Sequence, residues 1–279
     1  MDTAAQRRRT VMPGLGLTLG FSLTYLSLVV LLPLGALLVR ALGMPFADLL
    51  EVATSGRVAR ALALSFGAAA MAAVINLLIG PMVAWVMVRY RFPGRRVLDA
   101  VVDLPFALPT AVAGVALASL FDAGGWLGSL LEPLGVSVAY TPAGIVVALV
   151  FIGLPFVVRT VQPVIQEVDR EVEEAAATLG AGRWHTIARV ILPTLVPAAL
   201  TGFVLALARG IGEYGSVIFI AGNLPNRTEI APLLIVIKLE EFDYPGAMAI
   251  AVIMLLVSFA LLLAVNLLQA WSRRRLGEA

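Results

Sequence analysis

Three residue types that carry much of protein chemistry are absent or nearly absent from this chain. None of its 279 residues is cysteine, which excludes disulfides, thiolate metal sites and cysteine nucleophiles together. The single histidine, His185, has no second histidine or cysteine with which to complete a metal site or a catalytic triad. The single lysine, Lys238, follows Ile237 rather than glycine, so no G-x-x-x-x-G-K-[ST] phosphate loop occurs. If a nucleoside triphosphate drives this protein, another chain hydrolyses it.

Charge is also scarce, and long apolar runs are abundant. Charged residues make up 14% of the chain and hydrophobic residues 60%, and the mean hydropathy is +0.96, far above that of soluble domains. Six apolar segments are each long enough to cross about 30 Å of hydrocarbon as a helix. They cover residues 17–39, 61–88, 101–121, 142–161, 195–220 and 247–270. We therefore expect an all-α, polytopic membrane protein with six transmembrane helices in contact with membrane lipid.

The distribution of basic residues predicts the orientation of these helices. With the N-terminus inside, 14 of the 20 basic residues fall on the inner side and 5 on the outer side, and Arg209 lies within the fifth segment. Both termini are therefore expected in the cytoplasm. The pI near 9.3 does not indicate nucleic acid binding, because the net charge is only +2 and the basic residues are divided among loops.

The stretch GIGEYG at residues 210–215 matches the dinucleotide-binding pattern G-x-G-x-x-G, and Glu229 lies near the offset of a ribose ligand. That fingerprint requires a strand that turns tightly into a helix. Here a long apolar segment precedes the glycines with no turn between, so the match is coincidental. Small residues spaced by four at Gly202, Ala206 and Gly210 instead predict close helix packing in lipid.

Arg209 and Glu213 are the clearest charges within the six segments. Being four residues apart, they would share one face of a helix. Each charge near the bilayer centre costs about 2.5 to 3.5 kcal/mol, so both must be paired or face water or cargo. Two interpretations stay open at this point: an internal pair that fastens the fifth helix to a neighbouring helix, or an arginine beside an anion path whose charge Glu213 partly neutralises.

The start of the third segment is interrupted by Pro105, Pro109 and Thr110. Backbone groups freed by the prolines need protein or a water-filled cavity to satisfy them, and broken helices in transporters commonly line the path. A simple proline kink explains the pattern equally well. Thr110 and Ser119 are therefore candidate cargo contacts through their hydroxyl groups. Asp103 is expected to cap a helix start rather than carry protons.

The longest predicted inner stretch covers residues 162–197. Apolar residues at helical spacing between 164 and 179 predict one amphipathic helix, rich in acidic residues on its other faces. Gly180, Ala181 and Gly182 break it, and residues 183–192 form a second short helix that Pro193 closes. Such a helix-turn-helix either docks on a partner or is a connecting loop with solvated charges.

The stretch EEAAATLGAGRWHTIARVILP (173–193) resembles the EAA loop of ATP-binding-cassette (ABC) importer permeases. The matching positions are Glu174, Ala175, Ala176, Gly180, Leu192 and Pro193, whereas Val190 stands where isoleucine is commoner. In that family the loop inserts into a groove of the ATPase subunit. The resemblance implies that residues 162–193 form a cytoplasmic coupling loop between helices 4 and 5, with Trp184 and His185 against the ATPase.

Four further stretches, within residues 103–121, 155–164, 212–223 and 228–251, look like the T-type permease of bacterial sulfate/thiosulfate importers. This resemblance implies the type I ABC importer permease fold in one transmembrane domain, with a tail, first helix and outer loop (1–60) and a permease core (61–270). It implies a bacterial inner-membrane location, an ABC ATPase dimer, a W-type permease as heterodimer partner and a periplasmic or lipid-anchored sulfate-binding protein. This chain is then a transporter subunit without a catalytic residue or cofactor, and ATP and Mg²⁺ bind to the partner ATPase.

Other functions are weighed against this one. A molybdate or tungstate permease is the nearest alternative, because these oxyanions have similar shape and charge. An ion-coupled carrier or an intramembrane enzyme is a different class of protein. That class would need polar groups within the membrane, and no paired Asp, Glu or His constellation accompanies Arg209 and Glu213.

Overall fold

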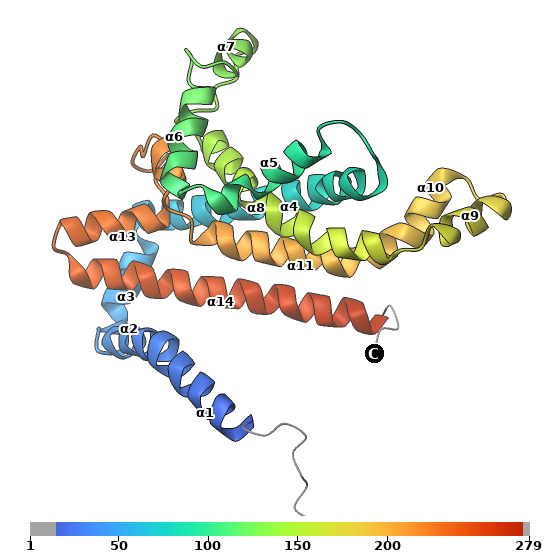
Figure 1. The fold of residues 1–279 in the computed structure, drawn as a ribbon. Helices are drawn as coiled ribbons and strands as arrows, with labels where there is room; N and C mark the ends of the chain where they lie inside the picture. The colour runs from blue at the N-terminus through green and yellow to red at the C-terminus, as the bar shows by residue number, and fades with distance from the viewer. Residues whose placement is uncertain (1–14, 276–279) are drawn as a thin grey trace, which may run out of the picture. The chain divides into compact units, whose positions relative to one another are not determined.

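The computed structural model describes residues 15–275, and every regular element in that range is a helix (Figure 1). The chain divides into two compact units, Met1–Leu49 and Leu50–Ala279. Residues 1–14 and 276–279 lie outside the described residues, and the cytoplasmic location of both termini stays a prediction.

The first unit is dominated by one long helical run. Helix α1 (Leu15–Leu26), a π-helical turn (Ser27–Leu31) and α2 (Leu32–Leu42) follow one another without a break. Residues Leu15–Arg40 of this run are long and apolar enough to cross a membrane, as the sequence predicted for the first segment. A short helix, α3 (Phe46–Thr54), begins at the end of this unit.

The second unit is built around three long helices, α4 (Gly56–Arg89), α8 (Pro142–Glu167) and α11 (Leu192–Ile211), which pack closely on one another. A fourth long helix, α14 (Tyr244–Arg275), runs beside α11 (Figure 1). The buried face of α8 includes Val157, Val158 and Val161, none of which is exposed at all. These helices bury part of their surface within the unit and leave the rest apolar and exposed, as expected of helices in lipid.

Small residues bring the three central helices together. A Cβ atom on Gly202 of α11 would lie 2.6 Å from the Cα atom of Val157 on α8, and one on Gly80 of α4 would lie 2.6 Å from a Val157 methyl group. Gly210 faces Ala69 of α4 at an ordinary van der Waals distance, and Ala206 is buried. The predicted packing role of Gly202, Ala206 and Gly210 is confirmed.

The shorter elements connect these helices. They are α5 (Arg95–Ala107), α6 (Thr110–Phe121), α7 (Gly128–Leu131), a 3₁₀ turn (Glu132–Leu134), α9 (Arg170–Thr178), α10 (Arg183–Thr186), the π-helical turn η3 (Ile187–Ile191), α12 (Val217–Ile220) and α13 (Ala231–Glu240). Among the described residues, five helical runs pass the length and hydropathy test for a membrane span, and the α5–α6 pair, bent by 119°, would be a sixth.

Two predicted segments differ from the structure. The third is not one span that begins at residue 101, because α5 starts earlier, at Arg95, and the chain turns sharply after Ala107. The fifth does not continue to residue 220, because α11 ends at Ile211 and α12 is separate. The sequence analysis also missed α13, whose ten residues are too few to span a membrane and were assigned to an outer loop.

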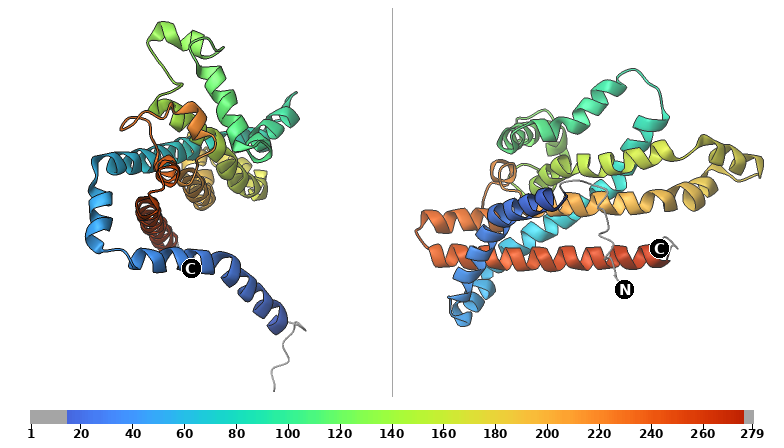
Figure 2. Two further views of the ribbon diagram at one scale, coloured as in Figure 1. Left: turned by 90° about the vertical axis from the view of Figure 1, so that its left-hand side faces the viewer. Right: turned by 60° about the horizontal axis from the view of Figure 1, so that its bottom comes forward.

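The two ends of the second unit carry different elements. Helices α9 and α10 extend beyond one end of the α8 and α11 pair, whereas α13 and its turn into α14 lie at the opposite end (Figures 1 and 2). The predicted inner loop (162–193) and the α13–α14 turn are therefore separated by the length of the bundle.

The glycine packing predicts a large effect of one added side chain. Gly202→Val should destabilise the protein by about 1 to 3 kcal/mol, because the new methyl groups would overlap the α8 backbone. Thermal unfolding of the purified protein measures this. Gly67→Val on α4 is the matched control, since a Cβ there meets nothing within 4 Å. Equal unfolding temperatures for both variants would contradict the proposed tight contact.

Candidate functional site

The first feature of the candidate site is the break between α5 and α6. Leu108 and Pro109 adopt extended conformations between the helices. The ring of Pro109 disfavours helical geometry at the preceding residue, so α5 cannot continue through Leu108. Pro105 lies inside α5 and does not end it. The break thus falls in the middle of the predicted segment, and Thr110 becomes the first residue of α6.

The second feature is the break between α11 and α12. Glu213 lies two residues beyond the end of α11 and is only 3% exposed. One carboxylate oxygen accepts hydrogen bonds from the backbone N–H and the hydroxyl group of Ser216, at 3.0 and 3.1 Å. The other oxygen lies 2.6 Å from Nη1 of Arg209. Glu213 thereby stabilises the turn that separates the two helices.

The predicted pairing of Arg209 with Glu213 is confirmed, but its setting differs from the prediction. Glu213 does not stand one helical turn above Arg209, because the helix has already ended. The guanidinium group of Arg209 is partly exposed, whereas the carboxylate is buried. Arg209 can therefore offer its remaining N–H groups to a ligand while one side stays neutralised.

The two breaks meet. A Cβ atom on Gly215 would overlap the hydroxyl group of Thr110 and lie 3.2 Å from its Cβ, and one on Gly114 of α6 would lie 2.8 Å from the Cα of Ser216. The first turn of α6 therefore rests on the turn that Glu213 holds. Free N–H groups at a helix N-terminus favour anions, and a hydroxyl group can donate a hydrogen bond.

Of the four candidate path residues, the structure brings three together. Thr110 contacts the Glu213–Ser216 turn, to which Arg209 is paired. Ser119 lies nine residues further along α6, which is about 13 Å along a helix axis. Its hydroxyl group therefore lies well away from the meeting point of the two breaks.

A cluster centred on Arg159 was missed by the sequence analysis. Arg159 of α8 donates to Asp103 at 2.8 Å, to Asp99 at 2.8 Å and to Gln162 at 2.6 Å. The prediction that Asp103 caps a helix start is wrong, because Asp103 lies well inside α5 and forms an ion pair with Arg159. The signal in the sequence was the spacing of Asp99 and Asp103, which places both carboxylates on one face of α5.

The predicted loop 162–193 is helical but divided differently. The amphipathic helix expected over 164–179 is interrupted at Val168 and Asp169, where α8 ends and α9 begins. Gly180, with φ of +78°, ends α9, and the N–H of Ala181 bonds back to the carbonyl of Ala176. The expectation that Pro193 closes a second helix is wrong: it lies in the first turn of α11, because a helix start tolerates a missing N–H.

An arginine anchors the start of α9. Arg89 forms a 2.9 Å ion pair with Glu173, donates a 2.8 Å hydrogen bond to the carbonyl of Val168 and lies over the ring of Trp85. Beyond this anchor, the predicted coupling residues are largely at the surface. Glu174, Ala175, Gly180, His185, Leu192 and Pro193 are exposed, Ala176 is half-buried, and Trp184 is 84% exposed.

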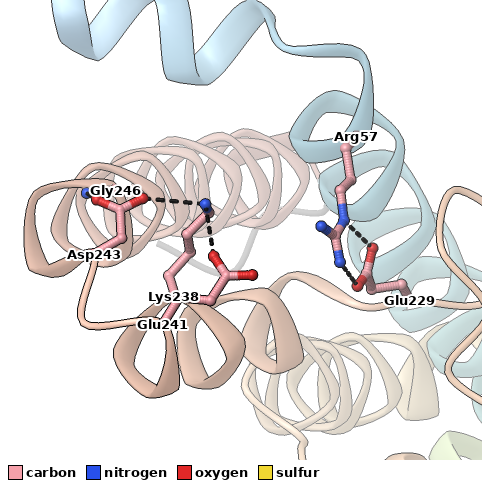
Figure 3. Close-up of polar contacts among 6 residues, drawn as sticks. All are labelled: Arg57, Glu229, Lys238, Glu241, Asp243 and Gly246. Atoms are coloured by element: carbon pink, nitrogen blue, oxygen red, sulfur yellow. Dashed lines mark hydrogen bonds and ion pairs between the residues drawn. The ribbon is translucent and has the colours of Figure 1, made fainter.

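At the opposite end, five charged residues form ion pairs: Arg57, Glu229, Lys238, Glu241 and Asp243 (Figure 3). Arg57 of α4 forms a two-point contact with the buried Glu229, at 2.6 and 2.8 Å. Lys238 contacts Glu241 at 3.0 Å and Asp243 at 3.1 Å. Glu229 therefore binds an arginine, and the glycines of 210–215 follow a helix instead of a strand, so neither half of the dinucleotide fingerprint is present.

The contacts between Lys238 and Asp243 favour the charged forms of both residues. The hydrogen bond to Glu241, followed by that to Asp243, raises the pKa of Lys238. The backbone N–H of Gly246, followed by Lys238, lowers the pKa of Asp243. The contribution of Asp243 to stability is thus lost only as pH falls below its ordinary pKa, and that of Lys238 only as pH rises above its own.

Comparisons with known proteins agree with this architecture. The family described as "Binding-protein-dependent transport system inner membrane component" matches residues 76–278. The sulfate transport system permease protein CysT of Escherichia coli (strain K12) is 49% identical, over 97% of this chain and 98% of that protein. The probable sulfate transport system permease protein cysT of Nephroselmis olivacea is 47% identical, over 92% of this chain and 90% of that protein.

A solved structure shares the fold. It is a crystal structure of a bacterial ABC transporter involved in the import of the acidic polysaccharide alginate, and one of its chains superposes with a TM-score of 0.76 at 16% identity. The match covers 92% of this chain and 94% of that one. The chain therefore has a type I ABC importer permease-like fold, and it belongs to the family of binding-protein-dependent transport system inner membrane components.

Proposed function

We propose that this chain is a channel-forming subunit of an ATP-driven importer for sulfate or thiosulfate in a bacterial inner membrane. The observation that carries the proposal is the identity of nearly half of all residues, over almost the whole length, to sulfate transport permease proteins. The structure supports a transport role because two interrupted helices meet inside the second unit. Such breaks are common where transporters bind cargo.

The oxyanion path is proposed to pass the junction of the two breaks. Arg209 supplies a partly exposed guanidinium group, Thr110 a hydroxyl group, and the first turn of α6 free N–H groups. Glu213 neutralises part of the arginine charge, which favours brief contact with a dianion over tight capture. Ser119 is proposed to meet the ion at a different depth along α6.

The loop 162–193 is proposed to be the cytoplasmic coupling element. Its helices α9 and α10 extend beyond the bundle, and Arg89 ties the start of α9 to the end of α4. A separate ATPase dimer would bind ATP and Mg²⁺. It would contact this chain at Glu174–Ala176, Gly180, Trp184 and His185. A movement of the ATPase would then pass through Leu192 and Pro193 into α11. Closure of the ATPase pair would then swing the bundle between inward-open and outward-open states.

The other partners follow from the same proposal. A periplasmic or lipid-anchored binding protein would deliver the anion to the face opposite the coupling loop. A W-type permease would form the second half of the channel as a heterodimer, and both termini of this chain would be cytoplasmic. The proposed functional division is a tail, first helix and outer loop at 1–60, followed by the permease core at 61–270.

Reconstitution tests the proposal directly. The complete complex in lipid vesicles should take up sulfate only when ATP, the ATPase and the loaded binding protein are all present. ATPase stimulation should be measured for sulfate, thiosulfate, molybdate and tungstate, each presented by the binding protein. Stimulation by sulfate or thiosulfate is expected. Uptake driven by a proton gradient alone, or stimulation by molybdate or tungstate only, would contradict the proposal.

Arg209→Ala should lower the maximal uptake rate about tenfold or more, because a charge-assisted hydrogen bond is worth about 1.5 to 3 kcal/mol. The variant leaves Glu213 buried and unpaired, so Arg209→Ala/Glu213→Gln separates lost cargo contact from lost stability. Arg227→Ala, at an exposed position, is the matched control. Normal uptake by correctly assembled Arg209→Ala complexes would remove Arg209 from the path.

Trp184→Ala should weaken binding of the ATPase about tenfold or more, because a central interface tryptophan commonly contributes 2 kcal/mol or more. The side chain is 84% exposed in this chain, so its removal should leave the unfolding temperature unchanged. Trp126→Ala, at a residue 74% exposed on a different loop, is the control. Co-purification and titration of the ATPase measure the effect, and equal affinities for the two variants would argue against docking through α10.

A further inference from the structure

A cavity of about 620 Å³ lies between the last turns of α4 and the start of the η3–α11 run. Pro81, Met82 and Trp85 of α4 face Ile187, Leu192 and Leu195 across it. Both walls belong to helical runs that are long and apolar enough to span a membrane. We call this cavity the α4–α11 groove. Because its walls are apolar and belong to helical runs that could span a membrane, an apolar chain fits it better than water does.

The groove has a polar end. Tyr90 and Arg91, the first two residues after α4, line this end. Tyrosine and tryptophan side chains are typical of the boundary between hydrocarbon and head groups, and Tyr90 and Trp85 both line the groove. Arg91 is exposed and forms no ion pair with any residue that the structure describes. The occupant that fits is apolar along most of its length and negatively charged at one end.

The turn that follows adds further positive charge. Arg95 and Arg96 begin α5 and line a second, polar cavity of about 310 Å³ with Asp99 and Gln162. The nearby carboxylates do not neutralise this turn, because Asp99 binds Arg159 and Glu173 binds Arg89. Arg91 therefore lines the polar end of the groove, and Arg95 and Arg96 follow it four and five residues further along the chain.

We propose that the α4–α11 groove is a binding site for an anionic phospholipid, with an acyl chain in the groove and the phosphate group against Arg91. A transmembrane helix of a partner subunit is the competing occupant. An apolar helix would cover the walls but would bring no anionic group to Arg91, whereas a phosphate group accepts charge-assisted hydrogen bonds from an arginine. The lipid matches both the apolar walls and the charge at the end of the groove, and its site is separate from the junction of the two breaks.

Photo-crosslinking of the complete complex tests the site. Vesicles would contain either photoreactive phosphatidylglycerol or photoreactive phosphatidylcholine, and labelled peptides would be mapped by mass spectrometry. The groove residues should be labelled about fivefold more by the anionic lipid, the ratio that one basic residue near an anionic surface gives. Arg91→Gln should remove most of that preference, and Arg227→Gln should leave it unchanged. Met82→Trp, which fills the groove, should lower labelling by both lipids.

Accessibility of the groove provides an independent test. The chain contains no cysteine, so Met82→Cys creates one unique thiol. In the assembled complex this thiol should react with a lipid-soluble maleimide, and anionic lipid should slow the reaction more than phosphatidylcholine does. Equal labelling by the two lipids, or an unchanged preference in Arg91→Gln, overturns the proposal. Protection of the thiol in the absence of anionic lipid also overturns it, because a partner protein would then cover the groove.

Discussion

Close packing of α4, α8 and α11 is the constraint on which the rest of the second unit depends. Lipid tails are as apolar as the side chains, so burying an apolar side chain between two helices in lipid gains little free energy. The helices therefore associate mainly through van der Waals contact between closely approaching backbones. Gly80, Gly202 and Gly210 permit that approach, and Val157 fills the space that two of these glycines leave. A fixed centre of this kind allows other segments to be interrupted without loss of the fold. One break follows Ala107, at the end of α5, which packs on α8. The other follows Ile211, at the end of α11, which is one of the three central helices.

Arginine side chains of the long helices form ion pairs with carboxylates. Arg209 with Glu213, Arg159 with Asp99 and Asp103, Arg57 with Glu229, and Arg89 with Glu173 each place an arginine against at least one carboxylate. The pairs join different elements in three of the four cases. Only the Arg209 pair lies at a junction of interrupted helices. Its carboxylate stabilises a turn while its guanidinium group remains partly exposed. The pair does not fasten α11 to a neighbouring helix, and contact of Arg209 with an ion stays a prediction.

The arrangement separates three tasks along the bundle. The junction of α6 with the Glu213 turn brings the Thr110 hydroxyl group close to the Arg209 pair, and α9 with α10 carries exposed residues at one end. The Arg89 contacts connect that end to α4, which is part of the closely packed centre. Movement of α9 would therefore reach the centre through a polar anchor as well as through the continuous run from η3 into α11. The α4–α11 groove lies beside this run, so such a movement would change the space available to a bound lipid.

The sequence alone determined the membrane class, the continuous helices around α4, α8 and α14, the small-residue packing of α11 and the pairing of Arg209 with Glu213. These follow from local rules: the length of an apolar run, the spacing of small residues, and the cost of an isolated charge in hydrocarbon. Tertiary structure alone decided that Thr110 meets Gly215, that Arg159 holds α5 through Asp103, and that α13 is a helix at the end opposite α9 and α10. The two contacts join residues far apart in the chain. Which residues meet depends on which helices pack together, and no local pattern of residues specifies that packing.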